Sequence, residues 1–232
     1  MNEPGTPPLH VQQTEDGSST LVQASQHAES YHSLHGALSE ARYVFARQGL
    51  GRWLAEHGLA PHARVLEYGL GTGMNLLASL ELVLARGLPL TYTGLELHPL
   101  GDELLSQLRL GDADEEAVRA WRRGMHAPWD APLDLGCGIH LNKRALRFQD
   151  FRPQPASHDV VYFDAFSPST CPELWSAEVF RGAHLALAPG GLLVTYSASG
   201  LAKRALRAAG FHLERLPGAL GKRHMLLARK EG

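Results

Sequence analysis

Residues 64–75 read RVLEYGLGTGMN, and this stretch decides the fold. A short apolar strand ends near Glu67, three glycines follow at alternate positions, and a Leu- and Ala-rich helical pattern covers residues 75–85. Glycines permit a sharp turn and a close approach of the backbone to a ligand, and the first turn of a helix presents unpaired N–H groups. The stretch therefore predicts a strand, a ligand-binding loop and a helix. The three glycines of the loop are Gly69, Gly71 and Gly73.

The rest of the chain repeats this alternation of strands and helices. Apolar runs predict further strands at residues 91–96, 140–148, 160–163 and 192–196. Helical patterns fall at residues 102–110, 113–123, 177–187 and 201–209, a loop is expected at 124–138, and a turn at Pro189-Gly190-Gly191. Residues 211–215 and 224–229 predict an antiparallel C-terminal edge. This alternation is typical of an α/β fold with a mostly parallel, doubly wound sheet of the Rossmann-like type.

The N-terminal part has a different pattern. Leu9 to Gln13 and Thr20 to Gln23 flank Asp16-Gly17, a dipeptide that favours a tight β-hairpin. Apolar residues at helical spacing then predict helices that Gly49 and Gly51 break in two. We expect a flexible N-terminus with a hairpin, an N-terminal helical layer and a Rossmann-like domain, at residues 1–28, 29–60 and 61–232.

Composition limits the class of protein. The 232 residues, 44% of them hydrophobic, suffice for one α/β domain with appendages. No apolar run reaches the roughly 18 residues that a membrane-spanning helix requires, and no signal-peptide pattern is present, so we expect a soluble, cytoplasmic protein without a membrane partner. Cys137 and Cys171 indicate neither a disulfide framework nor a zinc site. No HExxH or paired-cysteine context accompanies the histidines, so no metal is expected and a structural role is favoured for His27, His32 and His35.

The formal net charge of −2 hides a strong asymmetry. Seven acidic residues and one arginine fall between Glu96 and Glu116, whereas residues 200–230 hold eight cations and one acid, a local charge of +7. The basic segment can meet phosphates, although a solvated charged surface is the more common explanation of such a run.

Two carboxylates favour a sulfonium cofactor in the glycine loop. The spacing of the glycines differs from the dinucleotide pattern G-x-G-x-x-G, and Glu67 would repel a pyrophosphate but attract a cationic methionine moiety. Glu96 ends the second strand, where a carboxylate can accept hydrogen bonds from both ribose hydroxyls. We therefore predict S-adenosyl-L-methionine. A nicotinamide cofactor and a purely structural turn stay open as alternatives.

Two acid and aromatic pairs follow later strands. Asp150 and Phe151 offer a carboxylate and a ring to an adenine, or are a loop acid and a core aromatic. Asp164 leaves the strand of residues 160–163 at its carboxyl end, where doubly wound folds bind ligands, and Phe166 lies two residues on. An acid beside an aromatic suits a flat acceptor that carries an amine.

Methyl transfer to an amine would give Asp164 a defined role. The attacking nitrogen gains positive charge, so a fixed carboxylate beside it stabilises the transition state. An amine with a lysine-like pKa must first lose a proton, which costs about 4 to 5 kcal/mol at pH 7. We assign Asp164 first to positioning and charge stabilisation, and second to base catalysis.

Several motifs, in the same order along residues 28–229, resemble the aminomethyluridine methyltransferases of bacterial tRNA, the methyltransferase half of a bifunctional biosynthesis protein. They are Ser30-Tyr31-His32-Ser33, residues 36–45, residues 67–75, Asp164-x-Phe166-Ser167-Pro168, Pro172-Glu173-Leu174-Trp175, Pro189-Gly190-Gly191, Tyr196-Ser197-Ala198 and Gly221-Lys222-Arg223-x-Met225. The chain departs from the family at Ser169, Thr170 and Cys171, where Lys and Asn are common.

The resemblance implies a Rossmann-like class I methyltransferase that methylates the exocyclic amine of 5-aminomethyl(-2-thio)uridine at the tRNA wobble position. It assigns the nucleoside to Asp164 and Phe166, and the substrate further to Tyr31, Lys222 and Arg223, the last two on tRNA phosphates. It assigns the cofactor to Glu67, Gly69, Gly71, Gly73, Asn75 and Glu96.

The length of 232 residues leaves no room for the flavin-dependent oxidase half of that family, so we expect a separate enzyme to supply the aminomethyl group. Two other functions stay open. The acceptor of the methyl group could be a small amine or hydroxyl metabolite, or the chain could be a catalytically idle RNA-binding module.

Overall fold

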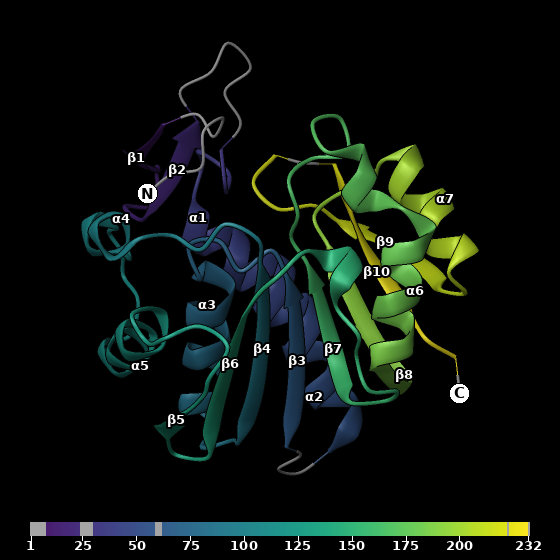
Figure 1. Ribbon diagram of the computed structural model, residues 1–232, viewed down its shortest axis with the longest axis horizontal. Coiled ribbons are helices and arrows are strands. Elements are labelled where there is room, and N and C mark those ends of the chain that lie inside the picture. Colours follow the sequence, from purple (N-terminus) through teal and green to yellow (C-terminus); the bar gives the residue numbers. More distant parts are fainter. Residues whose placement is uncertain (1–7, 24–29, 59–61, 222, 232) are drawn as a thin grey trace.

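The computed structural model describes residues 8–23, 30–58, 62–221 and 223–231. A twisted eight-stranded sheet in the order β5-β6-β4-β3-β7-β8-β10-β9 forms its centre (Figure 1). The strands are β3 (Ala63–Tyr68), β4 (Leu90–Glu96), β5 (Pro132–Gly136), β6 (Ile139–Ala145), β7 (His158–Phe163), β8 (Leu187–Thr195), β9 (His212–Pro217) and β10 (His224–Arg229). The predicted doubly wound sheet is confirmed.

The centre of the sheet is parallel and both of its edges are antiparallel. Strands β6, β4, β3, β7 and β8 run parallel, and β10 and β9 close the predicted antiparallel edge. The loop expected at residues 124–138 is wrong at residues 132–136, where β5 pairs antiparallel with β6. Its alternating Leu133 and Leu135 are too few to distinguish a strand from a loop between Pro132 and Gly136.

Helices cover both faces of the sheet. On one face lie α1 (Ala37–Glu40), the π-helix η1 (Ala41–Gly51), α2 (Arg52–His57), α3 (Met74–Leu84) and α5 (Glu115–Met125), with the short α4 (Asp102–Gln107) at the periphery. On the other face lie α6 (Ala177–Ala186), α7 (Gly200–Ala208) and the 3-10 turns η2 (Phe148–Asp150) and η3 (Pro172–Trp175). Successive residues of β3 serve opposite cores, since Val65 packs with the first group and Leu66 with the second.

The N-terminal layer begins with the predicted hairpin. Its strands are β1 (Leu9–Gln13) and β2 (Ser19–Gln23), with Gly17 in the turn at a φ of +80°. We expect residues 1–8 to be poorly ordered, and residues 1–7 and His27 lie outside the described residues. No helix in the described ranges is long and apolar enough to cross a membrane.

The predicted break at Gly49 and Gly51 is wrong, because helical structure continues from α1 through η1 into α2. A Cβ atom on Gly49 would lie 2.9 Å from both Tyr162 Cε1 and Val194 Cγ2. This glycine therefore serves the close packing of η1 on the sheet. The predicted turn at Pro189-Gly190-Gly191 is also wrong as a separate element, since it lies within β8 at a shift of register against β7.

Candidate active site

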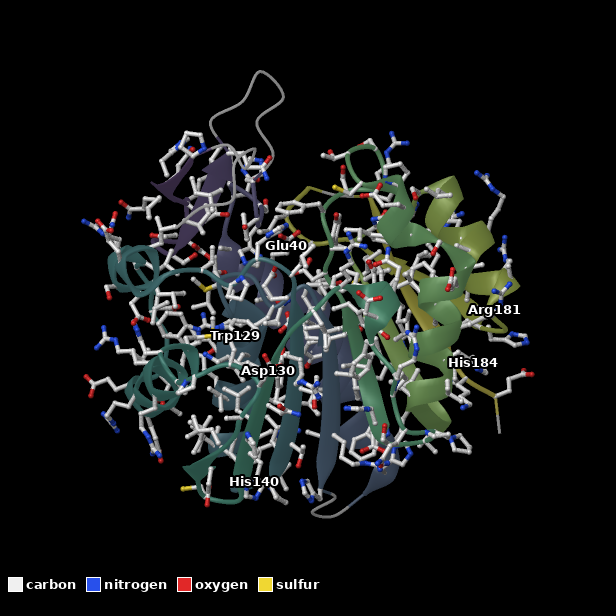
Figure 2. All side chains as sticks on the ribbon, in the orientation of Figure 1. Glu40, Trp129, Asp130, His140, Arg181 and His184 are labelled. Carbon is white, nitrogen blue, oxygen red and sulfur yellow. The ribbon has the colours of Figure 1, made fainter. Side chains whose placement is uncertain are left out.

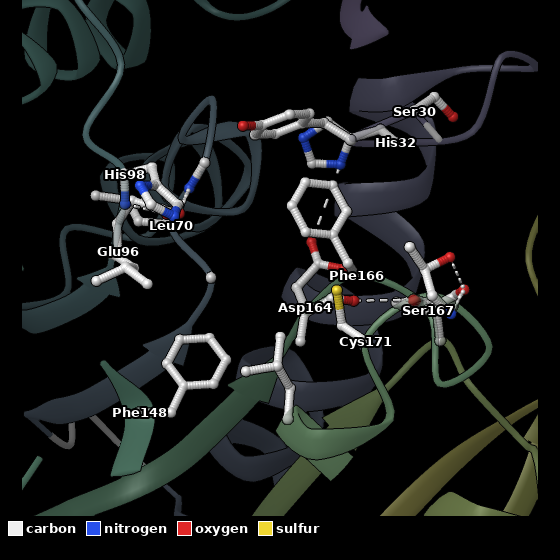
Figure 3. A pocket seen from close by; sticks show the side chains of 18 of the residues that line it. Ser30, His32, Leu70, Glu96, His98, Phe148, Asp164, Phe166, Ser167 and Cys171 are labelled. Carbon is white, nitrogen blue, oxygen red and sulfur yellow. Dashed lines mark hydrogen bonds and ion pairs between the residues drawn. The ribbon is translucent and has the colours of Figure 1, made fainter. Parts of the chain in front are cut away.

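A cavity of about 1070 Å³ lies at the carboxyl ends of the central parallel strands (Figure 3). Ligand pockets usually measure about 300 to 1,000 Å³, so the cavity has room for a cofactor together with part of an acceptor. Its lining comes from residues 30–33, 69–71, 96–98, 147–149, 164–167, 170–171 and 173–174, with Gln23, Glu40 and Tyr196. Figure 2 shows Glu40 near this end of the sheet and His140 at the opposite end.

The glycine loop is shaped by contacts as well as by conformation. Gly69 has a φ of +91°, and a Cβ atom there would lie 2.5 Å from the carbonyl oxygen of Asp164. Gly73 has a φ of +72°, and its Cβ atom would lie 2.6 Å from Met125 Sδ and 2.8 Å from Trp121 Nε1. Gly69 thus lets the loop approach the end of β7, while Gly73 faces α5 instead of the cavity.

Glu96 is fixed at the end of β4. Its Oε2 accepts the Gly71 N–H at 3.0 Å, and its Oε1 accepts the His98 N–H at 2.9 Å. A carboxylate oxygen can accept more than one hydrogen bond, and the side chain lines the cavity. This geometry allows Glu96 to accept hydrogen bonds from a ligand's hydroxyl groups.

A buried polar network lies behind the cavity wall. Asn75 Nδ2 donates to Glu67 Oε1 at 2.7 Å and to Asp164 Oδ2 at 2.8 Å, and the Tyr92 hydroxyl donates to Glu67 Oε2 at 2.7 Å. Glu67 is fully buried, and burial, together with the neighbouring charge of Asp164, raises its pKa well above the usual range. Glu67 therefore supports Asp164 through Asn75 and does not itself line the cavity.

The hydrogen-bond acceptors of the site fit a cationic cofactor. Four carboxylates line the cavity, namely Glu40, Glu96, Asp164 and the exposed Glu173, and the buried Glu67 lies behind the cavity wall. Within the described part of the chain, Asn75 Oδ1 is a buried acceptor without a hydrogen-bond partner. The lining carboxylates suit the sulfonium and amino groups of S-adenosyl-L-methionine and would repel a pyrophosphate.

Aromatic side chains flank Asp164. The rings of Tyr31 and Phe166 meet edge to face, with centroids 5.1 Å apart. Two hydrogen bonds hold the loop that carries Phe166. Trp175 Nε1 donates to the carbonyl oxygen of Phe166 at 2.8 Å, and the Tyr196 hydroxyl donates to the carbonyl oxygen of Ala165 at 2.9 Å. The cavity therefore offers an acidic group beside an apolar ring in a fixed loop.

His32 lines the cavity too, although the sequence favoured a structural role for it. Its Nε2 lies 2.7 Å from Thr72 Oγ1, and its Nδ1 lies 3.9 Å from Asp164 Oδ2. Sequence reasoning also missed Glu40, Arg147 and Phe148 as cavity residues. The position of His32 beside Tyr31 in the Ser30–Ser33 motif was the one available signal.

The predicted site residues separate into three groups. Tyr31, Gly69, Gly71, Glu96, Asp164 and Phe166 line the cavity. Gly73, Asn75 and Glu67 lie behind it, and Asp150 and Phe151 do not line it either. Asp150 is exposed, Phe151 packs beside Tyr68, and the preceding Arg147, Phe148 and Gln149 line the cavity instead. Arg223 is exposed and does not line the cavity, and Lys222 lies outside the described residues.

The sequence is similar to those of known S-adenosyl-L-methionine-dependent methyltransferases. A family described as S-adenosyl-L-methionine-dependent methyltransferase matches residues 141–231. The tRNA 5-methylaminomethyl-2-thiouridine biosynthesis bifunctional protein MnmC of Aromatoleum aromaticum is 34% identical over 96% of this chain and 35% of its own length. The chain thus spans about a third of the length of the curated relatives it matches.

Solved structures show the same fold. MnmC2 from Aquifex aeolicus aligns with a TM-score of 0.76 and 25% identity, over 97% of this chain and 71% of that one. The S-adenosylmethionine-bound amino pentose methyltransferase CalS10 from Micromonospora echinaspora aligns with a TM-score of 0.50 and 18% identity, over 84% of this chain and 92% of that one.

Proposed function

Because the chain is a relative of the MnmC bifunctional proteins, with the fold and the cofactor of S-adenosyl-L-methionine-dependent methyltransferases, we propose that it methylates the exocyclic amine of 5-aminomethyl(-2-thio)uridine at the tRNA wobble position. One observation carries the proposal. Asp164 and the edge-to-face rings of Tyr31 and Phe166 line a cavity that also contains Glu96. An amine on a flat base needs this combination of a carboxylate and rings.

The cofactor would occupy the side of the cavity formed by the ends of β3 and β4. Glu96 would accept its ribose hydroxyls, the Gly69–Gly71 backbone would lie against its methionine part, and Phe148 would pack against its adenine. The residues predicted from the sequence for that adenine, Asp150 and Phe151, would act from behind Phe148. When bound, the cofactor supplies an electrophilic methyl group on a cationic sulfur.

Asp164 would orient the acceptor and stabilise charge. Its side chain is 9% exposed, and Asn75 Nδ2 holds one of its oxygens at 2.8 Å. A carboxylate fixed in this way does not need to reorganise when the amine nitrogen becomes cationic, and preorganised groups contribute most in a site that excludes water. Phe166 and Tyr31 would hold the base so that its amine points at this carboxylate.

Cations near the cavity support tRNA as the partner. Arg147 lines the cavity, and Lys203, Arg204 and Arg207 project from α7, which begins at the same end of the sheet. Arg181 projects from the neighbouring α6 at the right of Figure 2. None of these five side chains forms an ion pair with another described residue, so their charges are available to phosphates.

The proposal extends to cell biology. The protein would act in the cytoplasm, where tRNA is modified, and a separate enzyme would supply the aminomethyl group. Arg223 and Lys222 would add phosphate contacts along the basic C-terminal segment.

The test uses the purified protein, labelled S-adenosyl-L-methionine and three tRNA preparations that carry 5-aminomethyl-2-thiouridine, 5-aminomethyluridine or unmodified uridine at the wobble position. We expect label in the aminomethyl-bearing tRNAs only, recovered as the methylaminomethyl nucleoside by mass spectrometry, and a loss of at least about 100-fold in Asp164→Asn. Transfer to a small amine in a tRNA-free extract would show that the acceptor is this amine and not tRNA. Binding of tRNA without any transfer would identify an RNA-binding module.

A further inference from the structure

His32 reaches the cavity from outside the Rossmann-like sheet. It follows β2 and precedes α1, and its backbone N–H donates to Thr20 Oγ1 of the hairpin at 2.9 Å. Its ring lies between the glycine loop and Asp164, bonded to Thr72 on one side and facing Asp164 on the other (Figure 3). The residue is 8% exposed, so this position is fixed by packing.

The proposed reaction requires a proton acceptor that the role of Asp164 does not supply. An aminomethyl group is an ammonium ion at neutral pH, and only the neutral amine has the lone pair that attacks a methyl group. A carboxylate beside the ammonium ion stabilises the charged form, which makes deprotonation harder. Histidine is the side chain whose protonation changes near neutral pH, and it can accept a proton and release it to water.

The distances leave room for the acceptor nitrogen. His32 Nδ1 and Asp164 Oδ2 are 3.9 Å apart, which is too long for a direct hydrogen bond. A nitrogen placed about 2.9 Å from both atoms would see them at an angle of about 85°, so that one ammonium group could donate to both. If His32 Nε2–H donates to Thr72, the lone pair of Nδ1 faces this position.

Other groups on the wall are less suited to accept the proton. The other charged or titratable side chains that line the cavity, besides its tyrosines, are Glu40, Glu96, His98, Arg147, Cys171 and Glu173. Both oxygens of Glu96 accept backbone N–H groups, and Glu40 Oε2 accepts the Ser33 N–H at 2.9 Å. His98 lies on the cofactor side, next to Glu96, and is exposed.

We propose that His32 Nδ1 accepts the proton that the acceptor ammonium releases before methyl transfer. This inference rests on the proposed function, because it needs an amine in the cavity. The N–H bond of the ammonium breaks, its electron pair stays on nitrogen, and the proton binds Nδ1. That lone pair then forms the bond to the methyl carbon while the carbon–sulfur bond breaks and its electrons remain on sulfur. The methylated ammonium leaves, and the imidazolium, held beside Asp164, returns its proton to water.

The test compares pH–rate profiles for a single turnover on tRNA bearing 5-aminomethyluridine. Wild-type protein should reach a plateau near neutral pH, because the histidine supplies the neutral amine within the complex. In His32→Gln the rate should follow the free amine, so it should be at least about 100-fold lower at pH 7 and rise tenfold per pH unit toward pH 9. His35→Gln is the matched control, since His35 lies on the same segment, is exposed and pairs with Glu15.

A structural role for His32 predicts a different profile. If His32 only holds the cavity lining in place, its substitution would lower the rate by the same factor at every pH, and that result overturns the proposal. His32→Asn is measured in parallel, and calorimetric binding of S-adenosyl-L-methionine shows that either variant is folded. If the wild type methylates another amine, the proposed function is wrong and the same comparison is run on that amine. A wild type that methylates no amine refutes both.

Discussion

The substitution Asn75→Asp tests the buried network behind the cavity. It keeps the shape of the side chain but replaces the NH₂ group with a carboxyl oxygen, 2.7 Å from Glu67 Oε1 and 2.8 Å from Asp164 Oδ2. Three carboxyl groups would then meet at hydrogen-bond distance in a region where Asn75 is 1% exposed. Such a cluster can persist only if it takes up at least one additional proton on folding.

The cost follows from this proton. An unfolded aspartate has a pKa of about 3.9, so protonating one carboxyl group at pH 7 costs about 4 kcal/mol, and at pH 5 about 1.5 kcal/mol. The folded variant binds more protons than its unfolded form, so its stability relative to wild type decreases as the pH rises. The free energy of unfolding should therefore fall below that of wild type by about 4 kcal/mol at pH 7 and recover most of this at pH 5.

Urea unfolding of both proteins at pH 5, 6 and 7 measures the difference. Asn142→Asp is the control, because Asn142 is a half-buried strand residue outside the network, and its effect should stay below about 1 kcal/mol at each pH. A deficit in Asn75→Asp that is independent of pH, or below about 1 kcal/mol at pH 7, would refute the description of Asn75 as a bridge between two carboxyl groups.

Three further substitutions test the fold. Gly49→Ala should destabilise by about 1 to 3 kcal/mol in urea, because its Cβ atom meets the sheet at 2.9 Å, whereas Gly101→Ala, with open space around it, should stay within about 0.5 kcal/mol. Burial lowers the pKa of His158 to about 4, so the folded protein binds fewer protons than the unfolded protein. The free energy of unfolding should therefore fall by about 2 kcal/mol between pH 7 and pH 4.5, and His158→Gln should not show this fall. Asp159→Ala should lower the free energy of unfolding by about 2 kcal/mol, since this carboxylate accepts three hydrogen bonds from the half-exposed Arg64.

Sequence reasoning reached the elements whose signals are local. The glycine loop and the apolar run of β7 are each decided by residues within a few positions of one another, and both were placed correctly. Predictions from short patterns, or from residues whose role depends on distant contacts, were wrong. The strand β5 has only two apolar residues in five, and Gly49 reads as a helix breaker until the sheet that it packs against is known.

The same distinction holds for the site. Asp164 and Phe166 could be predicted because the carboxyl end of a buried parallel strand meets a ligand in this class of fold. The cavity position of His32 could not, since its ring contacts Thr72, which is 40 residues away in the sequence. The choice between Phe148 and Phe151 depends on the orientation of the η2 turn, which composition does not encode.

The N-terminal layer fixes the position of the residues that make these distant contacts. Asp16 accepts the Ser18 N–H at 3.0 Å within the hairpin and the Ser39 N–H at 2.9 Å at the start of the helical layer. These bonds fasten both ends of the segment that carries Tyr31 and His32, while Thr20 holds its middle. The sheet itself supplies Glu96 and Asp164 to the cavity. The segment that follows the hairpin forms another part of the cavity wall, so under the proposed function we expect the selectivity for the acceptor to depend on residues that precede the Rossmann-like sheet.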